Sequence, residues 1–236
     1  MKELFKKLYN KDVNSFNKIL KTNLKNNNKM FIVTANPETF MKSDSDSELK
    51  KLLQDNETIL VPDGIGIVKA SRSIGYHIEE RITGIDIANK LIEYGNELKK
   101  SIYLFGSTEE VIVSMKEVLN NKYNNLKIVG TSNGYVKDRD KVFKEIAKLE
   151  PDIVLVALGI PHQEKLIYKH LDKFKKGIFV GVGGSFDVIS GHKKRAPKIF
   201  IKLNLEWLYR IAKEPKRLKR FFESNVLFMF KVKKYK

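Results

Sequence analysis

The sequence predicts an α/β fold with a Rossmann-like, doubly wound and mostly parallel sheet, on three observations. Six short apolar runs recur between residues 30 and 182, and segments with helical spacing separate them. The runs are continuously apolar rather than alternating, which is typical of strands buried on both faces of a sheet. The chain has 236 residues and a 42% hydrophobic share, enough to bury one large core.

The expected strands are apolar runs bounded by turn residues. They read MFIVTA at residues 30–35, TILVP at 58–62, SIYLF at 101–105, LKIVG at 126–130, DIVLVAL at 152–158 and GIFVGV at 177–182. Helices are expected between them, at about residues 45–54, 65–74, 85–99, 109–121, 138–149 and 162–174. The fourth of these helices has the clearest start, because Ser107-Thr108 offers a hydroxyl cap and Glu109 and Glu110 complement the helix dipole in its first turn.

A basic helical segment follows the last expected strand. From His192 to the end, 15 lysines and arginines face three glutamates, so this segment carries +12 of the formal net charge of +17. Ile201, Leu205 and Leu208 fall at helical spacing, and Pro215 then breaks the helix. We therefore expect an α/β body over residues 1–195 and a basic amphipathic, membrane-docking appendage over residues 196–236.

The charge of the appendage predicts an anionic partner. We expect it to dock on an anionic membrane surface, with apolar side chains that have no further strand to pack on entering the interface: Leu218, Phe221, Phe222, Leu227, Phe228 and Phe230. The simpler alternative is that this stretch packs on the sheet as a final helical layer. An alternative from another functional class is nucleic-acid binding. It is disfavoured because the nearby aromatic residues follow helical stripes and do not form an exposed stacking platform.

Several classes of chemistry are disfavoured. The chain has no cysteine, which removes thiolate nucleophiles and cysteine-based zinc sites, and its four histidines are scattered. Residues 181–186 (GVGGSF) lack the last glycine of G-x-G-x-x-G, and no G-x-x-x-x-G-K-[ST] motif is present, so NAD binding and ATP hydrolysis are disfavoured. We expect no metal and no cofactor. No apolar run approaches the roughly 18 residues of a membrane span.

Small and polar residues follow all six expected strands. Ligands bind beyond the carboxyl ends of the strands in open parallel sheets, so these residues are candidates for a binding site. A single strand end of this kind is an ordinary turn, whereas six together favour a crevice. The candidates are Thr34, Asn36, Glu38, Asp63, Gly64, Gly66, Gly106, Ser107, Gly134, Tyr135, Gly159, Pro161, Gln163, Glu164, Gly181, Gly183, Gly184, Ser185 and Asp187.

Three acidic positions need a choice between chemistry and local structure. Asp63 directly follows an apolar strand, where a carboxylate can act as a general base, but an Asx-turn or a cap for the next helix is the simpler interpretation. The D-x-D patterns at residues 44–46 and 138–140 have the form of a metal-bound nucleotide-sugar site. Both precede helices, so capping explains them better.

An ordered set of motifs resembles the WecG/TagA/CpsF glycosyltransferases. The motifs span about residues 30–220, which is most of the chain, and any one of them alone would be weak. They are TANPE at 34–38, PDGIGIV at 62–68, RITGID at 81–86, LGIPHQE at 158–164, GVGGSFD at 181–187, SGHKKRAP at 190–197 and LEWLYRIAKEPKRLKR at 205–220.

The resemblance is closest to the TagA-type N-acetylmannosaminyltransferases, and it implies an inverting, metal-independent enzyme at the cytoplasmic face of the cell membrane. In that branch, UDP-N-acetylmannosamine gives its sugar to N-acetylglucosaminyl-diphospho-undecaprenol, which completes the linkage disaccharide of teichoic acid. The alternatives are another UDP-hexosamine or its uronic acid, used for a different surface polysaccharide, and a catalytically silent sugar-nucleotide sensor. The resemblance leaves a homo-oligomer open.

The family pattern also implies roles for individual residues. Asp63 becomes the base that deprotonates the acceptor hydroxyl. Thr34 and Asn36 would line the sugar pocket, with Arg81 and Gln163 nearby. The other implied substrate-binding residues, several of them around the nucleotide, are Gly106, Tyr135, Gly181, Gly183, Gly184 and Asp187.

Without a metal, backbone N–H groups and cationic side chains must stabilise the departing UDP. Arg195 and the appendage arginines Arg210, Arg217 and Arg220 can supply that charge. Arg217 and Arg220 are i,i+3 neighbours on one helical face, and guanidinium groups suit the bidentate binding of a diphosphate. Each arginine alone is more simply a solvated charge. Together, beside apolar residues, Arg210, Arg217 and Arg220 favour a lipid-diphosphate site.

Overall fold

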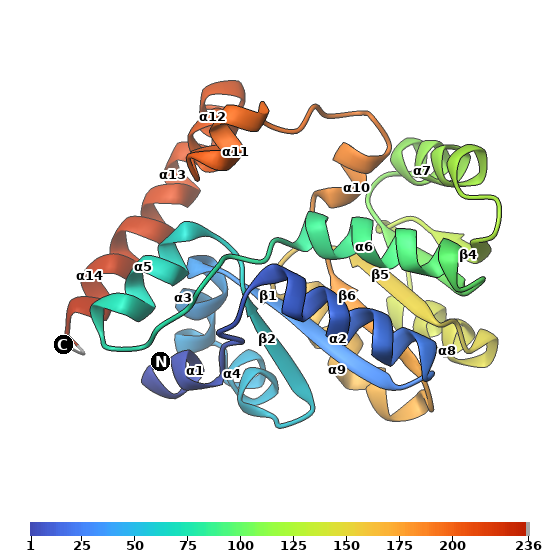
Figure 1. Cartoon of the computed structure of the whole chain (residues 1–236), viewed down its shortest axis with the longest axis horizontal. Helices are drawn as coiled ribbons and strands as arrows, with labels where there is room; N and C mark the ends of the chain where they lie inside the picture. The colour runs from blue at the N-terminus through green and yellow to red at the C-terminus, as the bar shows by residue number, and fades with distance from the viewer. Residues whose placement is uncertain (235–236) are drawn as a thin grey trace.

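Six parallel strands form one sheet in the order β2-β1-β6-β5-β3-β4. The computed structural model describes residues 1–234 and confirms the predicted α/β fold (Figure 1). The strands are β1 (Lys29–Ala35), β2 (Thr58–Pro62), β3 (Ser101–Gly106), β4 (Lys127–Ser132), β5 (Ile153–Ala157) and β6 (Gly177–Gly181).

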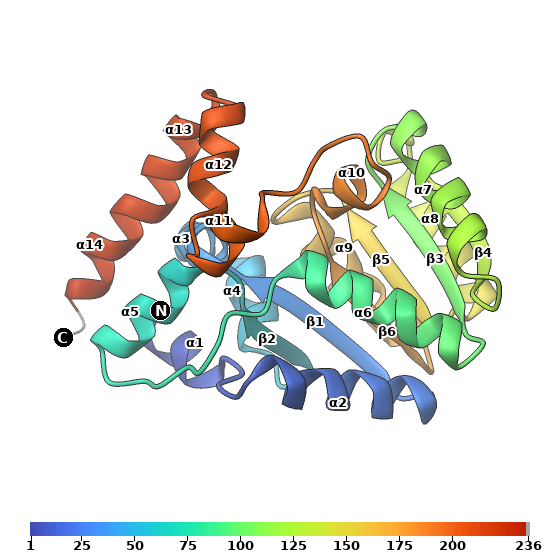
Figure 2. The same ribbon diagram turned by 45° about the horizontal axis from the view of Figure 1, so that its top comes forward.

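Helices cover both faces of the sheet (Figures 1 and 2). One face is covered by α2 (Val13–Lys25), α6 (Gly84–Glu97), α7 (Glu109–Lys122) and α10 (Ser185–Ile189). The other face packs against α1 (Lys2–Lys7), α3 (Pro37–Ser45), α4 (Ser47–Gln54), α5 (Ile65–Ser73), α8 (Arg139–Leu149) and α9 (His162–His170), which a 3₁₀ turn, η1 (Leu171–Lys173), extends.

The continuous apolar strands are explained by burial on both faces. In β1, Phe31 and Val33 belong to one hydrophobic cluster, whereas Met30 and Ile32 belong to the cluster on the opposite face. All four side chains are buried. Successive strand residues point to opposite faces, so a sheet covered on both sides needs apolar residues at every position.

The path of the chain places β6 beside β1. From β1 the chain moves outward to β2, crosses to β3 and the far edge strand β4, and returns through β5 to β6. The β1–β6 pairing joins residues almost 150 positions apart, such as Phe31 and Phe179. The carboxyl ends of β1, β2 and β6 therefore meet at one edge of the sheet, where a parallel α/β fold binds its ligands.

Two regions differ from the sequence expectation. The helices α1 and α2 were not expected, although Asp12 caps α2 by accepting from the Ser15 N–H group at 2.8 Å. The helix expected at residues 45–54 is preceded by a separate helix, α3, because Asp46 adopts an extended backbone (φ −118°, ψ 99°) between α3 and α4. Asp46 ends one helix and caps the next, which a hydrophobic pattern alone does not reveal.

The appendage consists of α11 (Lys198–Lys202), α12 (Glu206–Lys213), and a continuous helix made of α13 (Arg217–Phe221), the π-helical η2 (Phe222–Val226) and α14 (Leu227–Lys233). Among residues 1–234, no helix is long and apolar enough to cross a membrane. Leu218, Phe222 and Phe230 are more than half exposed.

Phe228 does not follow the expectation for this segment. Its side chain is 0% exposed, and its ring centroid lies 5.7 Å from that of Phe40 and 6.1 Å from that of Phe5. Val232, one helical turn later, is buried in the same cluster. The expectation that Phe228 enters a membrane interface is therefore wrong for this residue, because α14 packs against α3 and α5. Leu203, Leu208, Leu218 and Phe222 in the other appendage segments are exposed, whereas Phe221, also expected at a membrane interface, is half-buried against Trp207.

This packing predicts that Phe228→Ala destabilises the whole fold. Removing a fully buried ring leaves a cavity, and we expect a loss of about 3–5 kcal/mol in the free energy of unfolding. Phe230→Ala, two residues later on the exposed side of α14, should cost less than about 0.5 kcal/mol. Urea unfolding followed by circular dichroism measures both. Equal, small effects would mean that α14 is not part of the cooperative core.

Candidate active site

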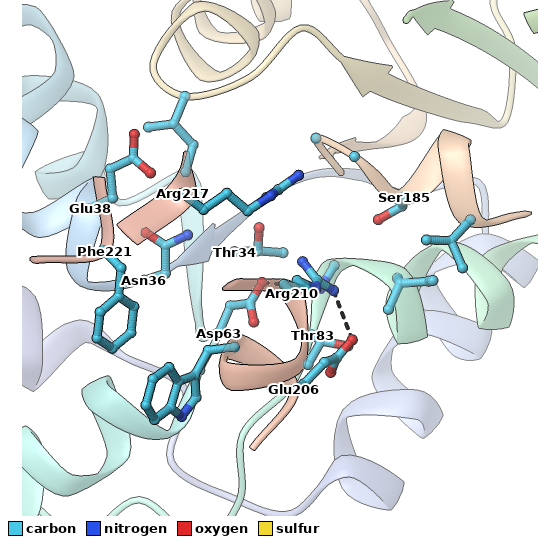
Figure 3. A pocket seen from close by; sticks show the side chains of 18 of the residues that line it. Thr34, Asn36, Glu38, Asp63, Thr83, Ser185, Glu206, Arg210, Arg217 and Phe221 are labelled. Atoms are coloured by element: carbon cyan, nitrogen blue, oxygen red, sulfur yellow. Dashed lines mark hydrogen bonds and ion pairs between the residues drawn. The ribbon is translucent and has the colours of Figure 1, made fainter. Parts of the chain in front are cut away.

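A cavity of about 870 Å³ opens at the carboxyl ends of the strands, between the α/β body and the appendage (Figure 3). Its walls come from the segments that follow β1, β2, β5 and β6, and from α12 and α13. It brings together most of the site residues expected from the sequence: Thr34, Asn36, Asp63, Arg81, Gln163, Gly183, Gly184, Asp187, Arg210, Arg217 and Arg220.

Four of the residues expected to bind substrate do not line this cavity, and neither do the strand-end candidates Gly134, Pro161 and Glu164. Gly106 backs against β5, where an added Cβ would lie 2.3 Å from the carbonyl oxygen of Ala157, so it is needed for close packing. Gly181 packs against the Gln163 side chain in the same way, at 2.6 Å. Tyr135 is 79% exposed beyond β4, the far edge strand. Arg195 borders a separate cavity of about 220 Å³ and pairs with Asp86 at 2.8 Å.

Asp63 is held at the end of β2 with its carboxylate in the cavity. Its backbone N–H donates to the Ala35 carbonyl at 2.9 Å, and its Oδ2 accepts from the Gly84 N–H at 3.4 Å. Gly64, with a φ of 100°, precedes α5 as its N-cap, and no side chain caps that helix. Asp63 is therefore not the helix cap that its sequence position suggested.

The environment of Asp63 makes it a stronger base than an ordinary carboxylate. The side chain lies deep in the cavity, and desolvation raises its pKa from 3.8 to about 6. The positive charges of Arg210 and Arg81 act in the opposite direction, while Glu206 raises this pKa further. At pH above 7 the group is mostly ionised, yet it holds a proton more tightly than a solvated aspartate, which suits a general base.

Gln163 joins two loops at the floor of the cavity. Its Oε1 accepts from the N–H groups of Gly159 and Gly183, both at 3.1 Å, and thus links the segment after β5 to the glycine segment after β6. Its Nε2 donates to Oε1 of Glu164 at 2.7 Å. Glu164 thereby fixes which end of the Gln163 amide faces the two glycines.

Glu164 is a buried acid, with 1% of its surface exposed. Its Oε2 has no hydrogen-bond partner among the described residues. Burial raises the pKa of Glu164 from 4.5 to about 7, and the hydrogen bond from Gln163 only partly offsets this effect. A buried carboxylate with an unsatisfied oxygen is costly to ionise, so the protonated form is favoured in the folded protein.

Each appendage arginine in the cavity is paired with a glutamate. The distances are 2.7 Å from Arg210 to Glu206, 2.8 Å from Arg217 to Glu214 and 2.7 Å from Arg220 to Glu38. The Arg220 pair joins the appendage to the body. A bound diphosphate would exchange the carboxylates held by Arg217 and Arg220 for phosphate oxygens, which are equally suited to a guanidinium group.

Glu206 is a further residue of the site that was not expected from the sequence. This side chain is buried in the cavity wall and lies close to Arg81, Arg195 and Arg210. The sequence did contain an indication, because Glu206 is one of only three acidic residues in the strongly basic segment from His192 to the end. The adjacent Trp207 stacks on Phe221 with ring centroids 4.5 Å apart, which forms an aromatic wall of the cavity.

The two D-x-D patterns serve local structure. Asp46 caps α4 and pairs with Lys165 at 2.7 Å, and Asp138 caps α8. Asp140 pairs with His170. Among residues 1–234, no group of three or more His, Cys, Asp or Glu side chains is placed to hold a metal ion.

The buried acid predicts a pH-dependent stability. Glu164 has a raised pKa in the folded state, so its contribution is fully present below its unfolded pKa and is lost as the pH rises through about 7. Because glutamine does not titrate, the Glu164→Gln variant does not undergo this loss of stability as the pH rises. We expect its melting temperature relative to the unmodified protein to be higher at pH 8 than at pH 5, by about 2 °C or more. The exposed control Glu145→Gln should show no such difference, and parallel behaviour of the two variants would contradict this assignment.

Comparison with known proteins gives a consistent result. The model for the "Glycosyl transferase WecG/TagA/CpsF family" matches residues 5–236. The chain is 45% identical over 189 residues to the N-acetylglucosaminyldiphosphoundecaprenol N-acetyl-beta-D-mannosaminyltransferase of Bacillus subtilis (strain 168), covering 80% of this chain and 73% of the relative. Proteins of the same name from Bacillus spizizenii and Staphylococcus aureus (strain MW2) are 40% and 36% identical over 210 residues, covering 89% of this chain and 81% and 82% of those proteins.

These matches confirm the resemblance drawn from the motifs. They extend it to the N-terminal residues, which carried no recognised motif. The residues after the strands that suggested a crevice are mostly gathered in one cavity, with the half-buried Asp63 in its lining. The chain therefore belongs to the WecG/TagA/CpsF glycosyltransferase family.

Proposed function

We propose that this protein is an inverting glycosyltransferase that moves N-acetylmannosamine from UDP-N-acetylmannosamine to N-acetylglucosaminyl-diphospho-undecaprenol. The relatives carry the name of this reaction. The observation that supports it best is Asp63, a carboxylate with a pKa raised to about 6 that faces a cavity shared with appendage arginines. A base and a cluster of cations on one cavity suit a transfer that creates an anionic leaving group.

In this mechanism, Asp63 acts on the acceptor. As the acceptor hydroxyl oxygen attacks the anomeric carbon of the donor, its proton passes to the Asp63 carboxylate, and the bond from that carbon to the UDP oxygen breaks. Attack from the side opposite UDP inverts the configuration. This agrees with the β-linkage in the relatives' names if the donor is an α-linked UDP-sugar. The Gly84 N–H keeps one carboxylate oxygen oriented, and the other stays available for the proton.

The departing UDP needs positive charge that the chain itself can provide. Gly183 and Gly184 line the cavity with backbone that ligand atoms can approach closely, because neither carries a Cβ. The guanidinium groups of Arg210, Arg217 and Arg220 lie on the appendage side of the same cavity. We assign the diphosphate groups of donor and acceptor to these elements and expect no metal requirement.

The acceptor is lipid-linked, so the cavity must reach a membrane surface. The appendage joins a high positive charge to exposed apolar residues, including Ile199, Leu203, Leu218 and Phe222. Each Lys or Arg near an anionic leaflet contributes roughly 1 kcal/mol. We propose that α11 to η2 lie on the cytoplasmic face of the membrane, while α14 anchors them to the body through Phe228. Nucleic-acid binding is disfavoured because Trp207 and Phe221 stack on each other inside the cavity.

Asp63→Asn tests the assignment of the base. We expect turnover to fall by about 10²–10⁴-fold, while the affinity for the UDP-sugar changes little, because the amide keeps the shape but cannot take the proton. The measurement is UDP release in excess EDTA, with a short-chain lipid-diphosphate-N-acetylglucosamine acceptor and a panel of UDP-sugars. Asp172→Asn, on an exposed turn, is the control. Near-normal turnover in folded Asp63→Asn would refute the assignment, and preference for another UDP-sugar would correct the donor.

Membrane docking is tested by the double change Leu218→Ser with Phe222→Ser. Both side chains are more than half exposed and lie outside the cavity wall. We expect affinity for vesicles rich in phosphatidylglycerol to fall by about tenfold or more, since each buried apolar side chain contributes on the order of 1–2 kcal/mol. Activity on a water-soluble acceptor should persist. The control is Val113→Ser with Leu149→Ser on the body, and equal vesicle binding by both double variants would count against docking through this surface.

A further inference from the structure

The Asp63 carboxylate lies near the guanidinium groups of Arg210 and Arg81 but forms no ion pair with them. In the described part of the chain, no cationic group comes within 4.0 Å of its carboxylate, and its side-chain hydrogen bond is the long one from the Gly84 N–H. Yet Arg210 and Arg81 are near enough to lower its pKa by their charge, and Glu206 is near enough to raise it. A desolvated carboxylate beside two arginines would ordinarily form an ion pair.

Glu206 accounts for this separation. Its Oε1 accepts from Nη2 of Arg210 at 2.7 Å, and its Oε2 lies 3.5 Å from Nη2 of Arg81. The Glu206 side chain is only 6% exposed, whereas the Arg210 side chain is 50% exposed. Arg210 lies one helical turn after Glu206 on α12. Figure 3 shows Arg210 next to Asp63 but turned toward Glu206.

The other contacts hold this arrangement in place. Arg81 also donates to the carbonyl of Ile201 at 3.3 Å. Arg195 lies 3.7 Å from Oε1 of Glu206, but its shorter contact is the one to Asp86, at 2.8 Å. Arg195 therefore pairs mainly with Asp86, and Glu206 interacts mainly with the two arginines beside Asp63.

We propose that Glu206 is a positioning residue that keeps the guanidinium groups of Arg81 and Arg210 beside the Asp63 carboxylate rather than on it. This proposal rests on the assignment of Asp63 as the base. A direct ion pair with arginine would occupy the lone pairs that must receive the acceptor's proton. It would also lower the pKa of Asp63, typically by about 1–3 units, and so weaken it as a base.

Glu206 and two of the residues that it influences belong to different parts of the molecule. Glu206 lies on α12, whereas Arg81 and Asp63 belong to the body. The carboxylate that draws Arg81 away from Asp63 therefore arrives only when α12 is docked over the cavity. Docking of the appendage and preparation of the base are coupled through one side chain.

The test is a titration of the Asp63 carboxyl group by ¹³C NMR in full-length protein labelled at aspartate, with Asp63→Asn used to assign the signal. In Glu206→Gln we expect the pKa of Asp63 to fall by about one unit or more, because the freed guanidinium groups move onto it. The acidic limb of the kcat/KM profile should move to lower pH by the same amount. Glu223→Gln, an exposed change in the same appendage, should leave both unchanged.

A general structural defect would not produce this shift. It would reduce activity at every pH without moving the titration of one carboxyl group. If Glu206→Gln does not fold, Glu206→Asp keeps the buried charge but withdraws it by one methylene, and a smaller shift in the same direction is expected. An unmoved Asp63 titration in the folded variant would overturn the proposal. Turnover that survives Asp63→Asn would instead remove the base assignment, and the titration would still report whether Glu206 controls these arginines.

Discussion

The parallel pairing of β1 with β6 is the contact on which the site depends. It joins Lys29–Ala35 to Gly177–Gly181, two segments far apart in the chain, and buries both faces of each strand. This pairing sets the Gly183 loop beside Thr34, whose hydroxyl donates to the carbonyl of Gly181 at 3.3 Å. Asp63 joins them because β2 pairs with the other side of β1. Without these long-range pairings, the strand-end residues would be separate turns.

The floor of the cavity shows polar groups placed where burial makes them costly. Gln163 holds two loops through one amide oxygen, and the adjacent Glu164 keeps a buried oxygen that has no hydrogen-bond partner within residues 1–234. An apolar pair of similar size would be cheaper in free energy. An apolar pair would not, however, hold the N–H groups of Gly159 and Gly183 in a fixed direction. The free-energy cost of burying these polar groups is therefore incurred at the place where the backbone must be held in position next to a ligand.

The appendage combines two kinds of contact with different consequences. Phe228 and Val232 fix α14 in the core of the body by apolar packing, which does not depend on ligands. Arg217 and Arg220 are instead held by Glu214 and Glu38, and phosphate oxygens can replace those carboxylates with little loss. The helix α14 is thus anchored, while the segment over the cavity rests on exchangeable ion pairs. This division allows substrate binding to rearrange the helices nearest the site without unfolding the domain.

The sequence by itself determined the fold class, all six strands to within two residues at either end and the candidate strand-end residues, because burial on both faces and turn chemistry are local signals. It also indicated the family, through the order of the motifs that resemble it. Only the tertiary structure decided that Phe228 is core, that Gly106 and Gly181 allow close packing against β5 and the Gln163 side chain, and that Tyr135 lies away from the cavity. It alone revealed Glu206 among three arginines. These facts depend on which segments meet in space, and neither hydrophobic periodicity nor residue type records the partner that a side chain finds across the fold.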